Sequence, residues 1–195
     1  MERLRFKITG ITPLLMHNAR LADPLDTTTR KIKEISSKRK KVDADHEEMA
    51  RLEWYGGLYL KDGKPCIPAY VFEGALIGKG GAARKVKMGK QAAAALLVDN
   101  DALLEFDDDS AKLEALWKNE KYVLRAAVNV AGSKIFRTRP KFDNWSATID
   151  VLYDSDKLNR EHVEQWVEVA GRDVGLMDWR PRFGRFEVES VEEVD

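Results

Sequence analysis

The chain has 195 residues, enough for one domain with a sizeable core, and its 33 basic residues balance its 33 acidic residues. A single cysteine excludes an internal disulfide framework, and three scattered histidines give no readable metal site. The N-terminus has no apolar signal region, and no apolar run reaches the roughly 18 residues of a membrane helix. We therefore expect a cytoplasmic protein with no membrane partner.

The first part of the chain is predicted to form a strand and then a long basic insertion. Leu4, Phe6 and Ile8 alternate with polar residues, which indicates a half-buried strand over residues 3–9. Residues 19–42 are polar and basic, so they are interpreted as an insertion that is partly helical or mobile. Helical periodicity resumes over residues 43–55, and Lys-Asp-Gly-Lys at residues 61–64 predicts a hairpin turn.

A glycine-rich helix is predicted next. Pro68 suits its first turn, and the apolar spacing extends to residue 86. Residues 74–80 superficially resemble a nucleotide phosphate loop, but the spacing between the glycines is one residue short and no Ser or Thr follows Lys79. We therefore expect no nucleoside triphosphate and no other cofactor.

The second half is predicted to alternate helices and strands. The expected segments are helices over residues 91–98 and 111–118, strands over 123–136 and 146–153 joined by a basic stretch over 137–145, a helix from Asn159 to 170 and a strand from Phe186. The overall order strand, helix, strand, strand, helix, strand is typical of an α+β fold with a ferredoxin-like (RRM-like) antiparallel sheet and helices on one face.

This order predicts one domain over residues 1–195, with the basic insertion at about 19–42 and a helical insertion at about 87–120. In a ferredoxin-like sheet the first and last strands are neighbours. Arg5 and Lys7 would then lie beside Glu187 and Glu189 as oppositely charged cross-strand pairs.

The charges are segregated along the chain, although they cancel in total. Residues 27–41 contain seven bases and one acid, residues 134–141 contain four bases and no acid, and residues 186–195 contain five acids and no base. Local basic regions can hold phosphates in a neutral protein, because salt limits each field to roughly 10 Å.

The segment at residues 171–185, here called the arginine loop, is the first candidate site. Its glycines allow positive φ, its guanidinium groups suit phosphate oxygens, and Trp179 and Phe183 offer faces for unpaired bases. The alternative interpretation is a helix C-cap followed by a solvated turn. A second candidate is the basic segment at residues 134–145, which also carries aromatic residues. The predicted nucleic-acid-binding residues are Lys79, Arg84, Lys134, Phe136, Arg137, Arg139, Lys141, Trp145, Arg172, Trp179, Arg180, Arg182 and Arg185.

A catalytic role is a separate hypothesis. His17 with Asp23 or Asp26 could act as acid and base in RNA cleavage, but a histidine beside a strand end more often has a structural role. We expect binding rather than catalysis and assign no metal ligand.

Three segments together resemble elements of the RAMP superfamily, as found in the backbone subunits of type III CRISPR effector complexes. They are Ile-Thr-Gly-Ile-Thr-Pro-Leu-Leu-Met at residues 8–16, Ile-Pro-Ala-Tyr-Val-Phe-Glu-Gly-Ala-Leu at residues 67–76, and residues 175–186 with Gly184-Arg185 before the last strand. In these subunits the corresponding elements are a first strand ending in a Thr-x-Leu turn, a helix entry and a glycine-rich loop. Glu73 departs from the pattern, because the family has a lysine there. Such departures indicate a remote relative, for example one encoded by a phage or mobile element.

The resemblance implies a subunit that binds single-stranded RNA, similar to a guide RNA, and forms homo-oligomers along it, with or without other effector-like subunits, in antiviral defence. Three alternatives stay open. They are a metal-independent or metal-assisted endoribonuclease of the same fold, a phage single-stranded DNA-binding protein, and an oligomer that uses the fold without nucleic acid. Phosphate and stacking contacts serve RNA and DNA alike, so they do not separate the two.

Overall fold

The computed structural model describes residues 1–130 and 132–194 and has an α+β architecture. The chain divides into two compact units. The first unit contains residues 1–14, residues 60–109 and the segment from residue 143 onward; the second contains residues 15–59 and 110–142. Residues 19–42, expected as an insertion, lie inside the second unit together with residues from the chain's middle.

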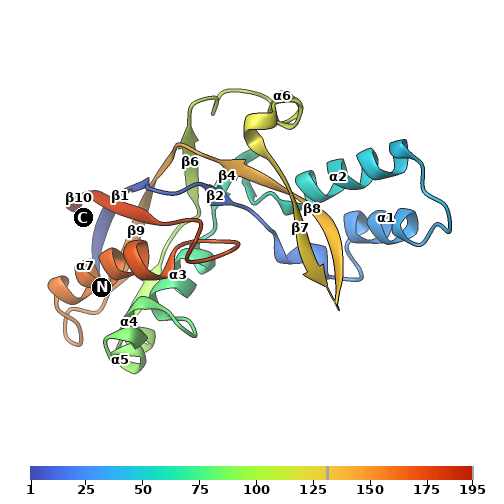
Figure 1. Cartoon of the computed structure of the whole chain (residues 1–195). Helices are drawn as coiled ribbons and strands as arrows, with labels where there is room; N and C mark the ends of the chain where they lie inside the picture. Colours follow the sequence, from blue (N-terminus) through green and yellow to red (C-terminus); the bar gives the residue numbers. More distant parts are fainter. Residues whose placement is uncertain (131, 195) are drawn as a thin grey trace. The chain divides into compact units, whose positions relative to one another are not determined.

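An antiparallel sheet forms the centre of the first unit (Figure 1). Its strands are β1 (Glu2–Gly10), β3 (Leu60–Lys61), β4 (Lys64–Ile67), β5 (Leu96–Val98), β6 (Ala102–Phe106), β9 (Trp145–Tyr153) and β10 (Phe186–Val194). The strand order is β10-β1-β9-β6-β4-β3, and β5 also pairs with β9. β5 and β6 pair with opposite ends of β9, so together they act as one interrupted strand beside it.

The predicted first strand and its neighbour are confirmed. Leu4, Phe6 and Ile8 are fully buried, and β1 pairs with β10 along most of its length. The predicted register is wrong, however. Arg5 lies opposite Glu192 and Lys7 opposite Ser190, and the register shifts between Lys7 and Ile8. A bulge of this kind inserts a residue into one strand and displaces all pairs beyond it, which strand periodicity alone does not reveal.

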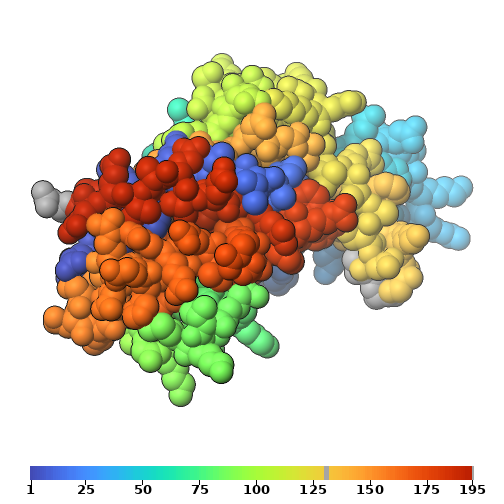
Figure 2. All heavy atoms as spheres, turned by 60° about the vertical axis from the view of Figure 1, so that its left-hand side comes forward, coloured from blue at the N-terminus to red at the C-terminus, as the bar shows by residue number. Residues whose placement is uncertain are grey.

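Helices of the first unit pack on the buried side of this sheet. They are α3 (Ala69–Ile77), α4 (Ala82–Lys85), α5 (Gly89–Ala95) and α7 (Arg160–Val169), the last of which continues into a π-helical turn at Ala170–Val174. In Figure 1, α3 and α7 lie together below strands β1 and β10. Figure 2 shows α7 in orange beside the red C-terminal segment, on the face that is turned toward the viewer.

Two helix predictions in this unit need correction. The helix expected from Pro68 to residue 86 ends at Ile77, where Gly78 leaves the helical conformation with ψ 179°, and Ala82–Lys85 form a separate short helix after Gly80 and Gly81. The glycines therefore interrupt the helix. The helix expected over residues 91–98 ends at Ala95, and Leu96–Val98 instead pair with β9.

The second unit contains a helical pair and a long hairpin. Its elements are a 3-10 turn at Ala19–Ala22, α1 (Thr27–Ser36), α2 (Asp43–Gly57), α6 (Leu113–Lys118), a 3-10 turn at Glu120–Tyr122, β7 (Val123–Val130) and β8 (Ser133–Phe142); the short strand β2 (Leu14–Leu15) pairs with β8. Trp54 on α2 is fully buried, and its indole N–H donates to the Tyr122 carbonyl at 2.8 Å.

The stretch over residues 137–145 was expected to join two strands, but most of it belongs to β8. Thr138, Pro140 and Phe142 are buried and alternate with half-buried basic residues. This is strand periodicity with long cations on one face. Among the described residues, no helix is long and apolar enough to cross a membrane.

Candidate nucleic-acid interface

The three segments that resemble RAMP elements meet at one end of the first unit's sheet. The Thr12 hydroxyl accepts from the Arg185 N–H at 2.9 Å, and the Pro13 carbonyl accepts from the Gly184 N–H at 2.8 Å. The ring of Phe72, from the second segment, lies 5.9 Å from that of Phe186. Segments far apart in the sequence therefore build one continuous local structure.

The arginine loop is closed by glycines that no other residue could replace without strain. Gly175 has φ 73° and donates to the Ala170 carbonyl at 2.8 Å, which ends the π-helical turn. Gly184 has φ 72°, and a Cβ there would lie 2.1 Å from the Leu176 carbonyl oxygen. The loop therefore has a defined shape, as positive φ and close backbone approach both require glycine.

The outer part of this loop combines aromatic rings with cations. The rings of Trp179 and Phe183 lie 5.8 Å apart, and the Arg182 guanidinium lies 5.9 Å from the Phe183 centroid. Trp179 is 36% exposed. Such a group can accept a base by stacking and a phosphate by charge.

The four arginines of the loop are not equivalent. Arg172 pairs with Asp173 at 3.1 Å, and its guanidinium holds the pKa of that carboxyl below its ordinary value. Arg185 is half-buried and donates to the Pro181 carbonyl at 2.9 Å. Among the described residues, Arg180 and Arg182 have no ion pair, so these two best suit a phosphate contact.

Lys79 and Arg84 follow the end of α3. Both residues are exposed, and Arg84 also donates to the Ile77 carbonyl at 3.3 Å and packs its stem close to Gly89.

In the second unit, the β7–β8 hairpin carries the other basic residues. Lys134 and Phe136 are exposed on β8, opposite Asn129 and Ala127. Arg137 is different, because it binds the Glu53 carboxylate at 2.7 Å. Arg139 and Lys141 are half-buried and make contacts of their own.

Trp145 was predicted to stack on bases, and the structure corrects this. Its side chain is 3% exposed, and its indole N–H donates to the Thr12 carbonyl at 2.9 Å. Its ring fills the space where a side chain at Gly10 would stand. A ring enclosed in this way is part of the hydrophobic core and has no exposed face on which a base could stack.

The two candidate catalytic carboxylates bind backbone N–H groups of their own segment. Asp26 caps α1 by accepting from the N–H groups of Thr28 and Thr29, and these bonds lower its pKa. Asp23 accepts from the Leu25 N–H at 2.8 Å. Both carboxylates therefore have backbone partners, which is a structural role. His17 is exposed and lines a hollow with Arg137 and Arg139. In the part of the chain that the structure describes, no cluster of three His, Cys, Asp or Glu side chains could hold a metal.

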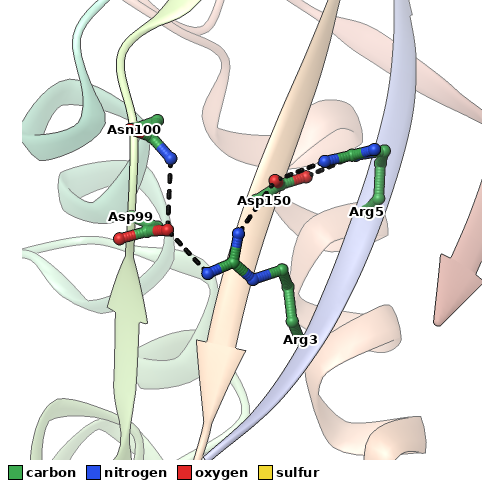
Figure 3. Close-up of polar contacts among 5 residues, drawn as sticks. All are labelled: Arg3, Arg5, Asp99, Asn100 and Asp150. Carbon is green, nitrogen blue, oxygen red and sulfur yellow. Dashed lines mark hydrogen bonds and ion pairs between the residues drawn. The ribbon is translucent and has the colours of Figure 1, made fainter. Parts of the chain in front are cut away.

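The polar face of the first unit's sheet is neutralised internally. Arg5 binds Asp150 with two hydrogen bonds of 2.7 and 2.8 Å, and Arg3 bridges Asp150 and Asp99 (Figure 3). Lys7 pairs with Glu105. The cations of this face therefore already have carboxylate partners.

Sequence reasoning missed the structural roles of two carboxylates, Glu53 and Glu73. Glu53 is 7% exposed and accepts from Arg137 and from the Thr138 N–H at 2.8 Å. The sequence feature that could have identified Glu53 is its position next to Trp54, on the apolar side of a predicted helix. Glu73, which departs from the family pattern, accepts from the Val98 N–H at 3.1 Å and so supports β5.

A scan against protein-family models and a search of curated proteins each found no match to this chain.

Proposed function

We propose that this protein is a RAMP-type subunit that binds single-stranded nucleic acid, RNA in the first instance, and that its first unit is ferredoxin-like. The strand order supports the fold assignment. With β5 and β6 taken as one strand, the order β10-β1-β9-β6 corresponds to the fourth, first, third and second strands in sequence, with α3 and α7 as the two intervening helices.

The observation that carries the functional proposal is the junction of the three resembling segments. Thr12, Pro13, Gly184 and Arg185 form one hydrogen-bonded structure, and it holds the arginine loop in a fixed shape. A preformed loop loses little conformational entropy when it binds, so its cations and rings can contribute most of their contact energy to affinity.

The binding surface that we propose excludes the polar face of the sheet. The ion pairs of Arg3, Arg5 and Lys7 would have to break before phosphates could bind there. In the first unit, the proposed contacts are Arg180 and Arg182 with the Trp179–Phe183 pair. Lys134 and Phe136 of the hairpin are separate proposed contacts within the second unit.

Charge reversal tests this proposal. The double variant Arg180→Glu, Arg182→Glu should bind single-stranded RNA more weakly, and the slope of log affinity against log salt should fall by about 0.7 for each lost contact. The measurement is fluorescence anisotropy with a labelled oligonucleotide at several salt concentrations.

The matched control is Lys64→Glu, Lys112→Glu, which reverses two exposed cations outside both candidate segments. If the control and the loop variant weaken RNA binding equally, the affinity depends only on the net charge of the protein, and the arginine loop is not the binding site.

A second candidate is an endoribonuclease of the same fold, favoured by the position of His17 in a hollow that Arg137 and Arg139 also line. A histidine can transfer the proton while an arginine stabilises the phosphate. This candidate predicts that RNA is cut without Mg²⁺ and that His17→Ala abolishes the cut, whereas Asp23→Ala does not. RNA that stays intact for hours while bound to the protein would leave binding as the activity.

A further inference from the structure

A hollow in the second unit combines aromatic, acidic and basic lining residues. Residues of α2 and of the β7–β8 hairpin line it, and α2 contacts β8 where the two elements meet in Figure 1; the hollow has a volume of about 420 Å³. The residues that decide its chemistry are Lys41, Met49, Glu53, Arg125, Phe136 and Arg137. All of them belong to one compact unit.

The apolar side of the hollow includes Phe136 and Met49. Phe136 is 66% exposed, a large unshielded area for an aromatic side chain on a strand. Aromatic rings of this kind bind unstacked bases by stacking, whatever the base is. Phe136 therefore supplies affinity but no base selectivity.

Glu53 supplies the selectivity. Its side chain is largely buried, and each oxygen accepts one hydrogen bond, Oε1 from Arg137 and Oε2 from the Thr138 N–H. A carboxylate has about four acceptor positions, so each oxygen can accept one more. Arg137 compensates the negative charge of Glu53. A neutral ligand with two parallel N–H donors could therefore fill the remaining acceptor position on each oxygen.

Guanine is the nucleobase with that pattern. Its N1–H and N2–H donors lie side by side on the Watson–Crick edge and match the two carboxylate oxygens. Adenine and cytosine each place an acceptor beside their amino group, and uracil has one N–H between two carbonyls. Each of these three would bring an acceptor against the Glu53 carboxylate, which costs binding energy.

Cations beside the hollow suit the phosphate of the same nucleotide. Lys41 and Arg125 both line it, and among the described residues neither has an ion pair with a carboxylate. Lys41 donates to the Lys38 carbonyl at 3.0 Å and can exchange this bond for a phosphate oxygen.

We propose that this hollow binds a guanine base, stacked on Phe136 and recognised by Glu53, with its phosphate near Lys41 and Arg125. The guanine has two possible sources with the same chemistry, a free guanine nucleotide or an unpaired guanosine in a bound RNA. The second source rests on the proposed function; the first does not.

The first experiment changes only the ligand. Calorimetry with GMP, IMP and AMP should give the tightest binding for GMP, since IMP lacks the N2 amino group and AMP presents an acceptor at N1. Loss of a bidentate contact predicts about tenfold weaker binding or more for AMP, with IMP between the two. Equal affinity for all three nucleotides, or no binding of any, would overturn the free-nucleotide source.

The second experiment uses RNA oligonucleotides that carry one guanosine, inosine or adenosine in an otherwise identical polyuridine. The guanosine oligonucleotide should bind most tightly, and Phe136→Ala should weaken it by about tenfold. Tyr70→Ala is the matched control, because Tyr70 is an aromatic residue of similar exposure, 63%, outside the hollow. Equal affinity for the three oligonucleotides overturns the RNA source.

Glu53→Gln gives a third readout, because the amide replaces one acceptor oxygen by a donor and should reduce the preference for guanine over adenine. Phe136→Ala and the ligand series stay informative if this variant does not fold. RNA bound without base preference would contradict the guanine site and leave the proposed function standing. GMP bound by a protein that does not bind RNA would support the guanine site and contradict the proposed function.

Discussion

At the scale of single residues, several polar side chains here act on the protein's own backbone. Asp26 caps α1, Glu73 supports β5, and Glu53 on α2 accepts from the Thr138 N–H of β8. Their sequence positions gave little sign of these roles, because the partners lie far away in the chain or depend on where a helix begins. A sequence pattern identifies a carboxylate, but the backbone N–H that it satisfies is defined only by the fold.

Asp150 provides the prediction at this scale. Hydrogen bonds from Arg5 hold the pKa of Asp150 below its ordinary value of 3.8. Because the pKa is lower in the folded state, the ionised carboxylate stabilises the fold above pH 3.8, and this contribution is lost as the pH falls through the folded-state pKa. Asp150→Asn should therefore lower the free energy of unfolding at pH 7 by about 1 kcal/mol, since solvent screens the partly exposed pair.

Urea denaturation followed by circular dichroism measures this effect. The difference between the wild type and Asp150→Asn should shrink as the pH falls below 3.8, because the wild-type carboxylate is protonated first in the unfolded chain and, at lower pH, in the folded protein. Asp156→Asn is the control, because Asp156 is exposed and its side chain has no ion pair in the described structure. A difference that stays constant from pH 7 to pH 2 would contradict the role given to ionised Asp150.

At the scale of elements, the sequence predicted strands with clear alternation better than segments with mixed signals. β1, α2, α7 and β10 were predicted close to their observed positions, since each shows one clean period or a capping residue. The prediction that residues 137–142 only join two strands was wrong, because the cations concealed the two-residue period of a strand. The prediction of a helix over residues 96–98 was wrong because the alanines before them favour a helix. The arginine loop was predicted as a candidate site. That Arg172 pairs with Asp173 and that Arg185 donates to the Pro181 carbonyl could be seen only in the folded structure.

At the scale of the whole molecule, oligomerisation along nucleic acid stays a prediction. The acidic β10 and the basic α1 offer surfaces of opposite charge on each copy. Native mass spectrometry with oligonucleotides of increasing length should show a stepwise increase in bound copies, because every added stretch of strand provides room for another subunit. A single copy on every length would reject the prediction, and a protein-only sample provides the baseline.

The position of β10 restricts the symmetry of any such assembly. Within residues 1–130 and 132–194, β10 has one strand neighbour, β1, so its other side is an edge of the sheet. The strand carries Glu187, Glu189, Glu192 and Glu193. A twofold dimer joined across this edge would bring the glutamates of one copy against the same residues of the other. Their repulsion disfavours closed pairs of identical surfaces. Copies that associate through β10 should therefore do so by unlike surfaces, and contacts of that kind produce rings or open chains.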